Sequence, residues 1–230
     1  MKLHTLREQV CRANGELKES GLVQYSFGNV SGVDRDAGVL VIKPSGVDYS
    51  SLTPELMVTV SLTDGAVLDA GAKPSVDTEI HRRLYLSFPA CGGIVHTHSE
   101  CATACAQAGI ALICRGTTHA DVFYGDIALT RMPTEQEVAG EYEANTGALI
   151  VEAFAGRDPA AVPAVLVAGH GPFAWGPSAH QAVHNAVMLE FIARMELHAR
   201  ALGVPLAPLP RHLLDKHYLR KHGSAAYYGQ

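Results

Sequence analysis

The feature that most limits the folds open to this chain is a short apolar run, Gly93-Ile94-Val95, that leads directly into His96-Thr97-His98. A short apolar run between turn residues predicts a buried strand. Side chains two residues apart on a strand point to the same face, so the imidazoles of His96 and His98 converge on one point. This arrangement supplies two ligands for a metal ion and requires a third from another part of the chain.

His170 has the same setting, because it follows the apolar run 164–168 and lies between two glycines. Three neutral imidazoles with an open fourth position are typical of a catalytic Zn²⁺ site, although Co, Ni and Cu also accept imidazole ligands. Asp77, near a predicted helix start, is a candidate oxygen ligand or base. The competing interpretation is structural: His96 and His98 would be core histidines, and His170 an unrelated loop residue.

Three small polar segments predict an anion site. Gly28 and Asn29 belong to a glycine-rich loop at 28–32, Ser45 and Gly46 to a turn at 43–46, and Ser75 to a predicted helix N-terminus. Free amides and hydroxyls at such places hold phosphate oxygens, and the helix dipole favours the negative charge. The alternative is that these segments are ordinary turns and a helix cap.

The remaining pattern predicts an α/β fold built in layers. Periodicity predicts helices over residues 3–21, 75–88, 99–108, 134–146 and 179–202, with a further helix start at Thr53-Pro54. Short β-rich runs predict strands at 39–42, 93–95, 127–129 and 164–168, and a hairpin from 57–62 to 66–68. The hairpin favours a largely antiparallel central sheet flanked by helices. No linker or repeat divides residues 1–230, so we expect a single domain.

Composition excludes several classes of function. Hydrophobic residues make up 47% of the chain and charged residues 18%, which is the balance of a folded globular protein. The net charge of −5 provides no basic field for nucleic acid, and no apolar run approaches the ~20 residues of a membrane span. The charged N-terminus lacks the apolar core of a signal peptide, which favours a cytoplasmic location.

The cysteine pattern and the number of histidines limit what single residues of these types indicate. Five cysteines without a Cys-x-x-Cys pattern indicate reduced thiols rather than a disulfide framework. Cys101 and Cys105 are four residues apart in a predicted helix near the histidines, and we interpret them as small core residues rather than soft metal ligands. Because the chain has 12 histidines, a histidine alone carries little information.

Segments along nearly the whole chain resemble the class II aldolase and epimerase family, and within it the L-ribulose-5-phosphate 4-epimerases. The His-x-His segment at 92–99 marks the superfamily. The 4-epimerase branch is marked more specifically by Thr117-Thr118-His119-Ala120-Asp121 and by the ending Tyr227-Tyr228-Gly229-Gln230. The segments 27–31, 41–49 and 213–223 match as well.

This resemblance implies a role for each candidate residue. One Zn²⁺ per subunit would be bound by Asp77, His96, His98 and His170. The substrate phosphate would be held at Gly28, Asn29, Ser45, Gly46, Ser75 and Val76. Lys43 and His217 would lie near the site, and Asp121 and Tyr228 would form the acid and base pair. The family usually has a serine where this chain has Val76, which implies either weaker phosphate binding here or compensation by a neighbouring group or a water.

The resemblance also implies an assembly. Members of the family form homotetramers of α/β subunits around a fourfold axis, with the active sites between subunits. The C-terminal tail, residues 205–230, would therefore contribute to the site of a neighbouring subunit.

The implied activity is an isomerase reaction that inverts C4 of L-ribulose 5-phosphate and produces D-xylulose 5-phosphate. The C4 hydrogen is not α to the C2 carbonyl, so a zinc-dependent retro-aldol step would break the C3–C4 bond and an aldol step would re-form it. The alternatives are a class II sugar-phosphate aldolase, a metal-dependent dehydratase, and a non-catalytic protein like the adducin head. Asp121 and Tyr228 favour the epimerase. Arabinose catabolism, ascorbate catabolism and related routes use this reaction, and the chain does not choose between them.

Overall fold

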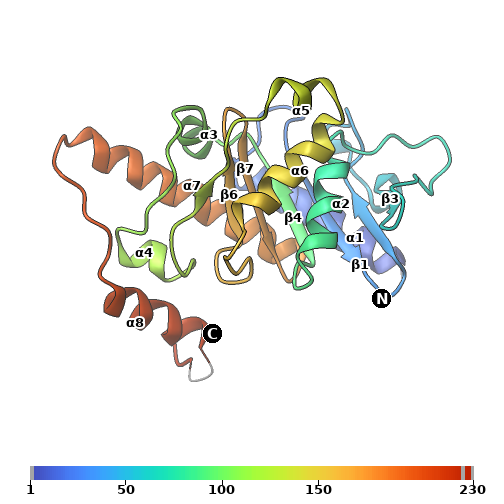
Figure 1. The fold of residues 1–230 in the computed structure, drawn as a ribbon. Coiled ribbons are helices and arrows are strands. Elements are labelled where there is room, and N and C mark those ends of the chain that lie inside the picture. The colour runs from blue at the N-terminus through green and yellow to red at the C-terminus, as the bar shows by residue number, and fades with distance from the viewer. Residues whose placement is uncertain (1–2, 224–225, 229–230) are drawn as a thin grey trace.

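The computed structural model describes residues 3–223 and 226–228, and in this part of the chain one sheet of seven strands forms the centre of the molecule (Figure 1). The strand order is β3-β2-β1-β4-β7-β6-β5, and every neighbouring pair is antiparallel except the parallel pair β5 and β6. The strands are β1 (Asn29–Asp34), β2 (Val39–Ile42), β3 (Val58–Ser61), β4 (Gly93–His96), β5 (Ala128–Leu129), β6 (Ala164–Val167) and β7 (Gly171–Gly176). The predicted single α/β domain with a largely antiparallel sheet is confirmed.

Helices cover both faces of this sheet (Figure 1). The α-helices are α1 (Leu3–Glu19), α2 (Thr78–Ser87), α3 (Glu100–Gln107), α4 (Thr117–Ala120), α5 (Glu135–Ala139), α6 (Tyr142–Ala153), α7 (Ala179–Ala201) and α8 (Arg211–His222). Because side chains alternate between the two faces along β4, Val95 packs in a core with α1, α3 and α7, whereas Ile94 packs in a second core with α2 and α6. The sheet is therefore a rigid layer held between two hydrophobic cores.

Two of the central strands, β1 and β7, were not predicted. β1 reads Asn-Val-Ser-Gly-Val-Asp and β7 begins with Gly-Pro, so both contain residues that are usually found in turns. Both strands pair with a neighbouring strand on each side. The hydrogen bonds and burial that stabilise them therefore come from these neighbours, and the local sequences do not predict them. The expectation that residues 28–32 form a loop was therefore wrong for Asn29 and the residues that follow it.

Several element boundaries also differ from the prediction. The helix predicted from Ser75 begins at Thr78, and the start at Thr53-Pro54 is only a 3₁₀ turn, Pro54–Leu56. The helix predicted over 134–146 is two helices, α5 and α6, separated at Gly140. The second arm of the hairpin is reduced to one bridge between Val60 and Val67. The proline-rich tail forms α8, which packs against α4 through Leu214 and Ala120.

Within the described residues, no helix combines the length and the apolar character needed to cross a membrane.

Candidate metal centre and phosphate pocket

Three histidines converge at one end of the sheet. His96 is the last residue of β4, His98 follows two residues later, and His170 lies in the tight turn between β6 and β7. The ring centroids are 4.8–5.0 Å apart, and each ring offers one nitrogen within 4.8 Å of the other two. The structure thus brings together the histidines that the sequence singled out, close enough for one ion to lie among them.

The surroundings of His96 and His170 favour neutral imidazoles, the form that binds a metal. Nδ1 of His96 donates to the carbonyl oxygen of Pro172 at 3.0 Å, which leaves Nε2 for an ion, and the ring stacks on Phe173. Burial lowers the pKa of His96 to about 4, and it also lowers the pKa of His170. Nδ1 of His170 is buried without a hydrogen-bond partner among the described residues. A metal ion would satisfy this atom, so the residues present fit the metal that the family implies.

Asp77 lies beside the histidines, at the residue before α2. Its Oδ2 accepts a hydrogen bond from Asn29 Nδ2 at 2.7 Å. Burial raises the pKa of Asp77, but the nearby imidazoles of His96 and His81 and the Asn29 bond outweigh it, so the pKa is lowered. Asp77 is therefore an anion next to the metal position, and its role as a metal ligand stays a prediction.

The predicted phosphate residues share a cavity of about 450 Å³ with Asp77 and the three histidines. The cavity lining includes Gly28, Asn29, Ser45, Gly46, Ser75 and Val76. Gly28 and Gly46 have φ values of 87° and 71°, a backbone conformation that favours glycine. One cavity thus holds both the candidate metal centre and the candidate anion site.

The free donors of the anion site differ from those expected. The amides of Ser45 and Ser75 donate to the carbonyl oxygens of Lys73 and Lys43, so these two amides already have partners. No backbone bond of this kind holds the amides of Gly46 and Val76 within the described residues. The groups left for an anion are therefore the Ser45 hydroxyl and the Gly46 and Val76 amides. The Ser75 hydroxyl accepts a hydrogen bond from Asn29 Nδ2 at 3.0 Å and donates a long one to Asp77 Oδ2 at 3.5 Å, which a bound anion would replace.

Lys43 brings a positive charge to the same cavity. Only 2% of the residue is exposed, and its Nζ donates to the carbonyl oxygen of Val47 at 2.7 Å and lies 4.8 Å from the centre of the Tyr49 ring. Burial lowers the pKa of Lys43 while the carboxylate of Asp48 opposes the shift. The lysine thus both holds the turn at 44–47 and offers charge to an anion.

Five residues of the cavity were not predicted as site residues, namely Ser26, Phe27, Pro44, Tyr142 and Glu143. The ring of Phe27 lies 5.8 Å from that of His98. Tyr142 and Glu143 begin α6, a second helix that the sequence analysis did not separate from the one that begins after Thr134. The break at Gly140 was the one sequence feature that could have suggested it.

Asp121, His217 and Tyr228 form a separate group, the α4–α8 cluster: Asp121 directly follows α4, His217 lies in α8, and Tyr228 lies in the tail after α8. The Asp121 carboxylate accepts a hydrogen bond from His217 Nδ1 at 2.9 Å and pairs with Arg220 at 3.0 Å and Lys221 at 3.2 Å. Although burial raises the pKa of Asp121, these three partners lower it overall. The Tyr228 ring lies 4.7 Å from the Arg220 guanidinium. Gly229 and Gln230 of the C-terminal motif lie outside the described residues.

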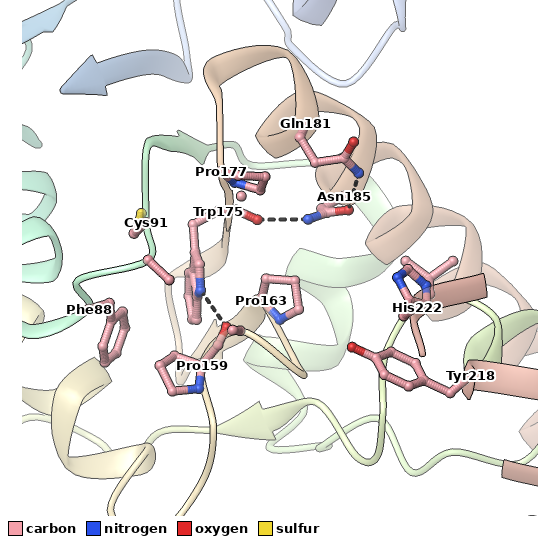
Figure 2. Close-up of a pocket in the computed structure, with 14 residues that line it drawn as sticks. Phe88, Cys91, Pro159, Pro163, Trp175, Pro177, Gln181, Asn185, Tyr218 and His222 are labelled. Atoms are coloured by element: carbon pink, nitrogen blue, oxygen red, sulfur yellow. Dashed lines mark hydrogen bonds between the residues drawn. The ribbon is translucent and has the colours of Figure 1, made fainter. Parts of the chain in front are cut away.

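This cluster is remote from the histidine cavity of its own chain. Tyr218 and His222 of α8 border a second cavity of about 440 Å³, with Cys91, just before β4, and Gly176, at the end of β7 (Figure 2). Cys91 and Gly176 mark the end of these strands opposite His96. None of Asp121, His217 and Tyr228 lines the histidine cavity. The structure therefore assembles the predicted residues into two groups on one chain.

Comparison with known proteins agrees with this fold. Residues 8–197 match the model of the class II aldolase and adducin N-terminal domain family, and the chain belongs to this family. The chain is 50% identical over 228 residues to the L-ribulose-5-phosphate 4-epimerase UlaF of Salmonella paratyphi C (strain RKS4594), covering 99% of this chain and 100% of that protein.

Two solved structures share the fold. An L-fuculose 1-phosphate aldolase superposes with a TM-score of 0.78 at 22% identity, covering 93% of this chain and 94% of that one. YgbL from Klebsiella pneumoniae superposes with a TM-score of 0.71 at 29% identity, covering 94% of this chain and 99% of that one.

Proposed function

We propose that this protein is an L-ribulose-5-phosphate 4-epimerase, which interconverts L-ribulose 5-phosphate and D-xylulose 5-phosphate. The observation that carries this proposal is the 50% identity, over the full length of both chains, to a protein of that name. The cavity that joins the histidines to the anion site supports it, because the substrate has a phosphate at one end and a ketone at the other. A cytoplasmic location belongs to the same proposal.

Substrate binding follows from the polar groups of the cavity. The hydroxyls of Ser45 and Ser75 and the amides of Gly46 and Val76 would bind the phosphate oxygens, with Lys43 supplying positive charge. This leaves the ketone end of the sugar facing His96, His98 and His170. The bound phosphate would keep the C4–C5 fragment in the site while its aldehyde group rotates and presents the opposite face.

His96, His98 and His170 would hold the metal, with Asp77 in or beside the coordination shell. Zn²⁺ suits three neutral imidazoles and, when bound, supplies a Lewis acid that polarises the C2 carbonyl. Hydrogen bonds from Asn29 to Asp77 and from His96 to Pro172 would fix the orientation of these ligands.

Proton transfer at the C4 oxygen needs one group on each face of the aldehyde. The ionised carboxylate of Asp121 would accept the C4 hydroxyl proton as the C3–C4 bond breaks. The phenol of Tyr228 would donate a proton to the same oxygen when the bond re-forms on the other face. In the reverse reaction the two residues exchange these roles.

Since Asp121 and Tyr228 do not line the histidine cavity of their own chain, they would act at the site of another subunit. We therefore propose a homo-oligomer, a tetramer, in which residues 205–230 complete a neighbouring site. The α4–α8 cluster already holds both residues together, so one subunit would deliver them as a pair.

The test is an assay of L-ribulose 5-phosphate conversion before and after verified removal of metal by a chelator. We expect D-xylulose 5-phosphate as product, loss of activity in the metal-free protein, and recovery with Zn²⁺. Release of free glycolaldehyde phosphate without inverted pentulose would indicate an aldolase instead. Full activity without metal would contradict the proposed zinc dependence.

A further inference from the structure

Arg220 contacts both residues of the predicted acid and base pair. One nitrogen of its guanidinium group donates to both carboxylate oxygens of Asp121, at 3.0 and 3.2 Å. The same guanidinium lies over the Tyr228 ring at 4.7 Å from its centre. Asp121 and Tyr228 are 107 residues apart in sequence, and this one side chain lies between them.

The backbone of Arg220 adds a second connection to the tail. Its carbonyl oxygen accepts hydrogen bonds from the amides of Tyr227 at 2.9 Å and Tyr228 at 3.1 Å. Arg220 therefore holds Tyr228 through the main chain on one side and through the aromatic ring on the other. Its Nε is buried without a partner among the described residues.

The chemistry of arginine suits this position better than that of lysine. A guanidinium group is planar and can bond a carboxylate and stack on an aromatic ring at the same time, whereas an ammonium is a compact point charge. Lys221 illustrates the difference, because it reaches only one Asp121 oxygen, at 3.2 Å, and lies farther from the Tyr228 ring, at 5.3 Å. Lys221 therefore contributes positive charge, whereas Arg220 contributes positive charge and also orients the Asp121 carboxylate and the Tyr228 ring.

We propose that Arg220 is a positioning residue of the epimerase reaction, which sets the Asp121 carboxylate and the Tyr228 phenol in a fixed relation to each other. This inference rests on the proposed function. Arg220 itself transfers no proton. It acts by fixing the positions of the two proton carriers relative to each other, so its loss reduces turnover rather than substrate binding.

Helix α8 contains a matched control for this role. Lys216 donates to the Tyr227 hydroxyl at 2.9 Å and lies 5.3 Å from the centre of that ring. It makes the same kind of cation–tyrosine contact one residue earlier in the tail, and no contact between it and Asp121 is present among the described residues. A general requirement for positive charge on α8 would affect Lys216 and Arg220 alike.

The experiment compares Arg220→Gln, Arg220→Lys and Lys216→Gln with the unmodified protein in the pentulose assay over a range of pH. In Arg220→Gln we expect kcat to fall about 10- to 100-fold with KM changed less than threefold, as for loss of a charged hydrogen bond. The acid limb of the kcat/KM profile should move to higher pH, because Asp121 keeps only His217 and Lys221 as partners. Arg220→Lys should keep the acid limb in place but recover only part of kcat. Lys216→Gln should match the unmodified protein.

Several outcomes would overturn the inference. One is an Arg220→Gln variant that matches Lys216→Gln in kcat. Another is a loss of kcat with an unshifted acid limb, which would indicate a merely structural role. If Arg220→Gln does not fold, a fully active Arg220→Lys would equally contradict it. If the unmodified protein shows no epimerisation, the proposed function fails, which is a different result from normal turnover that is insensitive to Arg220.

Discussion

Asn29 shows how one residue can join two halves of a site. Its Nδ2 donates to Ser75 Oγ at 3.0 Å and to Asp77 Oδ2 at 2.7 Å, and it pairs with His96 across β1 and β4. Its Oδ1 is buried without a partner among the described residues, which leaves an acceptor for a substrate hydroxyl. The sequence predicted Asn29 as a phosphate residue in a loop, whereas its strand position places it between the phosphate and metal ends of the cavity.

At the same scale, Val76 should limit phosphate affinity. Its side chain is 69% exposed at the cavity, so a hydroxyl can be added there without repacking. We expect Val76→Ser to lower KM for the pentulose phosphate by about tenfold or more with little change in kcat, because a hydrogen bond to a charged group contributes about 1.5 kcal/mol or more. Steady-state kinetics will measure this, with Val76→Ala as the control. An unchanged or higher KM would show that no phosphate oxygen lies there.

Tyr228 should be needed for chemistry and not for folding, because it is 53% exposed and projects from the tail. We expect Tyr228→Phe to lower kcat by about 10²- to 10⁴-fold, the usual range for a lost general acid or base. Tyr227→Phe is the matched control, since it removes the neighbouring hydroxyl. Equal rates for the two variants would remove Tyr228 from the mechanism.

Among the elements, β4 depends on two glycines that bring it close to α7. A Cβ at Gly93 would overlap the backbone of Ser178 and Ala179, and one at Gly92 would overlap Pro177. The close approach places β4 directly against the turn that leads from β7 into α7. His96 owes its position to this contact, because it ends the same four-residue strand.

Gly93→Ala should therefore destabilise the protein by about 3 kcal/mol or more, since backbone atoms cannot move aside as side chains do. Gly15→Ala is the matched control, a glycine-to-alanine change without close packing. Gly15 lies inside α1, and among the described residues no tertiary neighbour comes within 4 Å of where its Cβ would be. Alanine there should stabilise the protein by about 0.5–1 kcal/mol. Urea unfolding of the two variants will measure both effects. A Gly93→Ala variant of normal stability would contradict the packing argument.

At the scale of the whole molecule, the proposed reaction requires the two groups of predicted site residues to come from different subunits. Asp121 and Tyr228 lie on the α4–α8 unit, which borders the end of the sheet opposite the histidines. A single chain therefore presents the candidate metal and phosphate cavity at one end and the predicted acid and base pair at the other. In an oligomer, the histidine cavity of one subunit would meet Asp121 and Tyr228 of a neighbouring subunit.

Subunit mixing tests this arrangement. Tyr228→Phe lacks the tail function and His98→Asn lacks a metal ligand, so each variant alone should be nearly inactive. If sites are shared between subunits, refolding the two together should restore about a quarter of the activity, because some cavities then receive an intact tail. Refolding each variant with itself is the control. No recovery in mixed oligomers, verified by differently tagged chains, would place all the groups within one subunit.

The metal-free protein should lose stability in mild acid. Burial lowers the pKa of His81 to about 3 and that of His96 to about 4, both below the unfolded value of about 6.5. Below pH 6.5 the unfolded chain binds protons that the folded chain does not, so stability is fully present above pH 6.5 and falls as the pH falls.

Between pH 6.5 and 4.5 we expect a loss of about 2 kcal/mol for each of these two histidines, measured as the urea midpoint of the metal-free protein. Replacing the exposed His212 by asparagine should leave this pH dependence unchanged. A flat stability profile over this range would show that His81 and His96 titrate normally in the folded protein.

The sequence by itself determined the layered α/β class, the histidines His96, His98 and His170, and the polar segments of the phosphate pocket. These features are local, because strand periodicity and short motifs depend on neighbouring residues. Only the tertiary structure decided that β1 and β7 are central strands, that α6 contributes Tyr142 and Glu143, and that Asp121 meets Arg220 far from the histidines. Those outcomes depend on contacts between residues distant in sequence, whose hydrogen bonds and burial override weak local preferences.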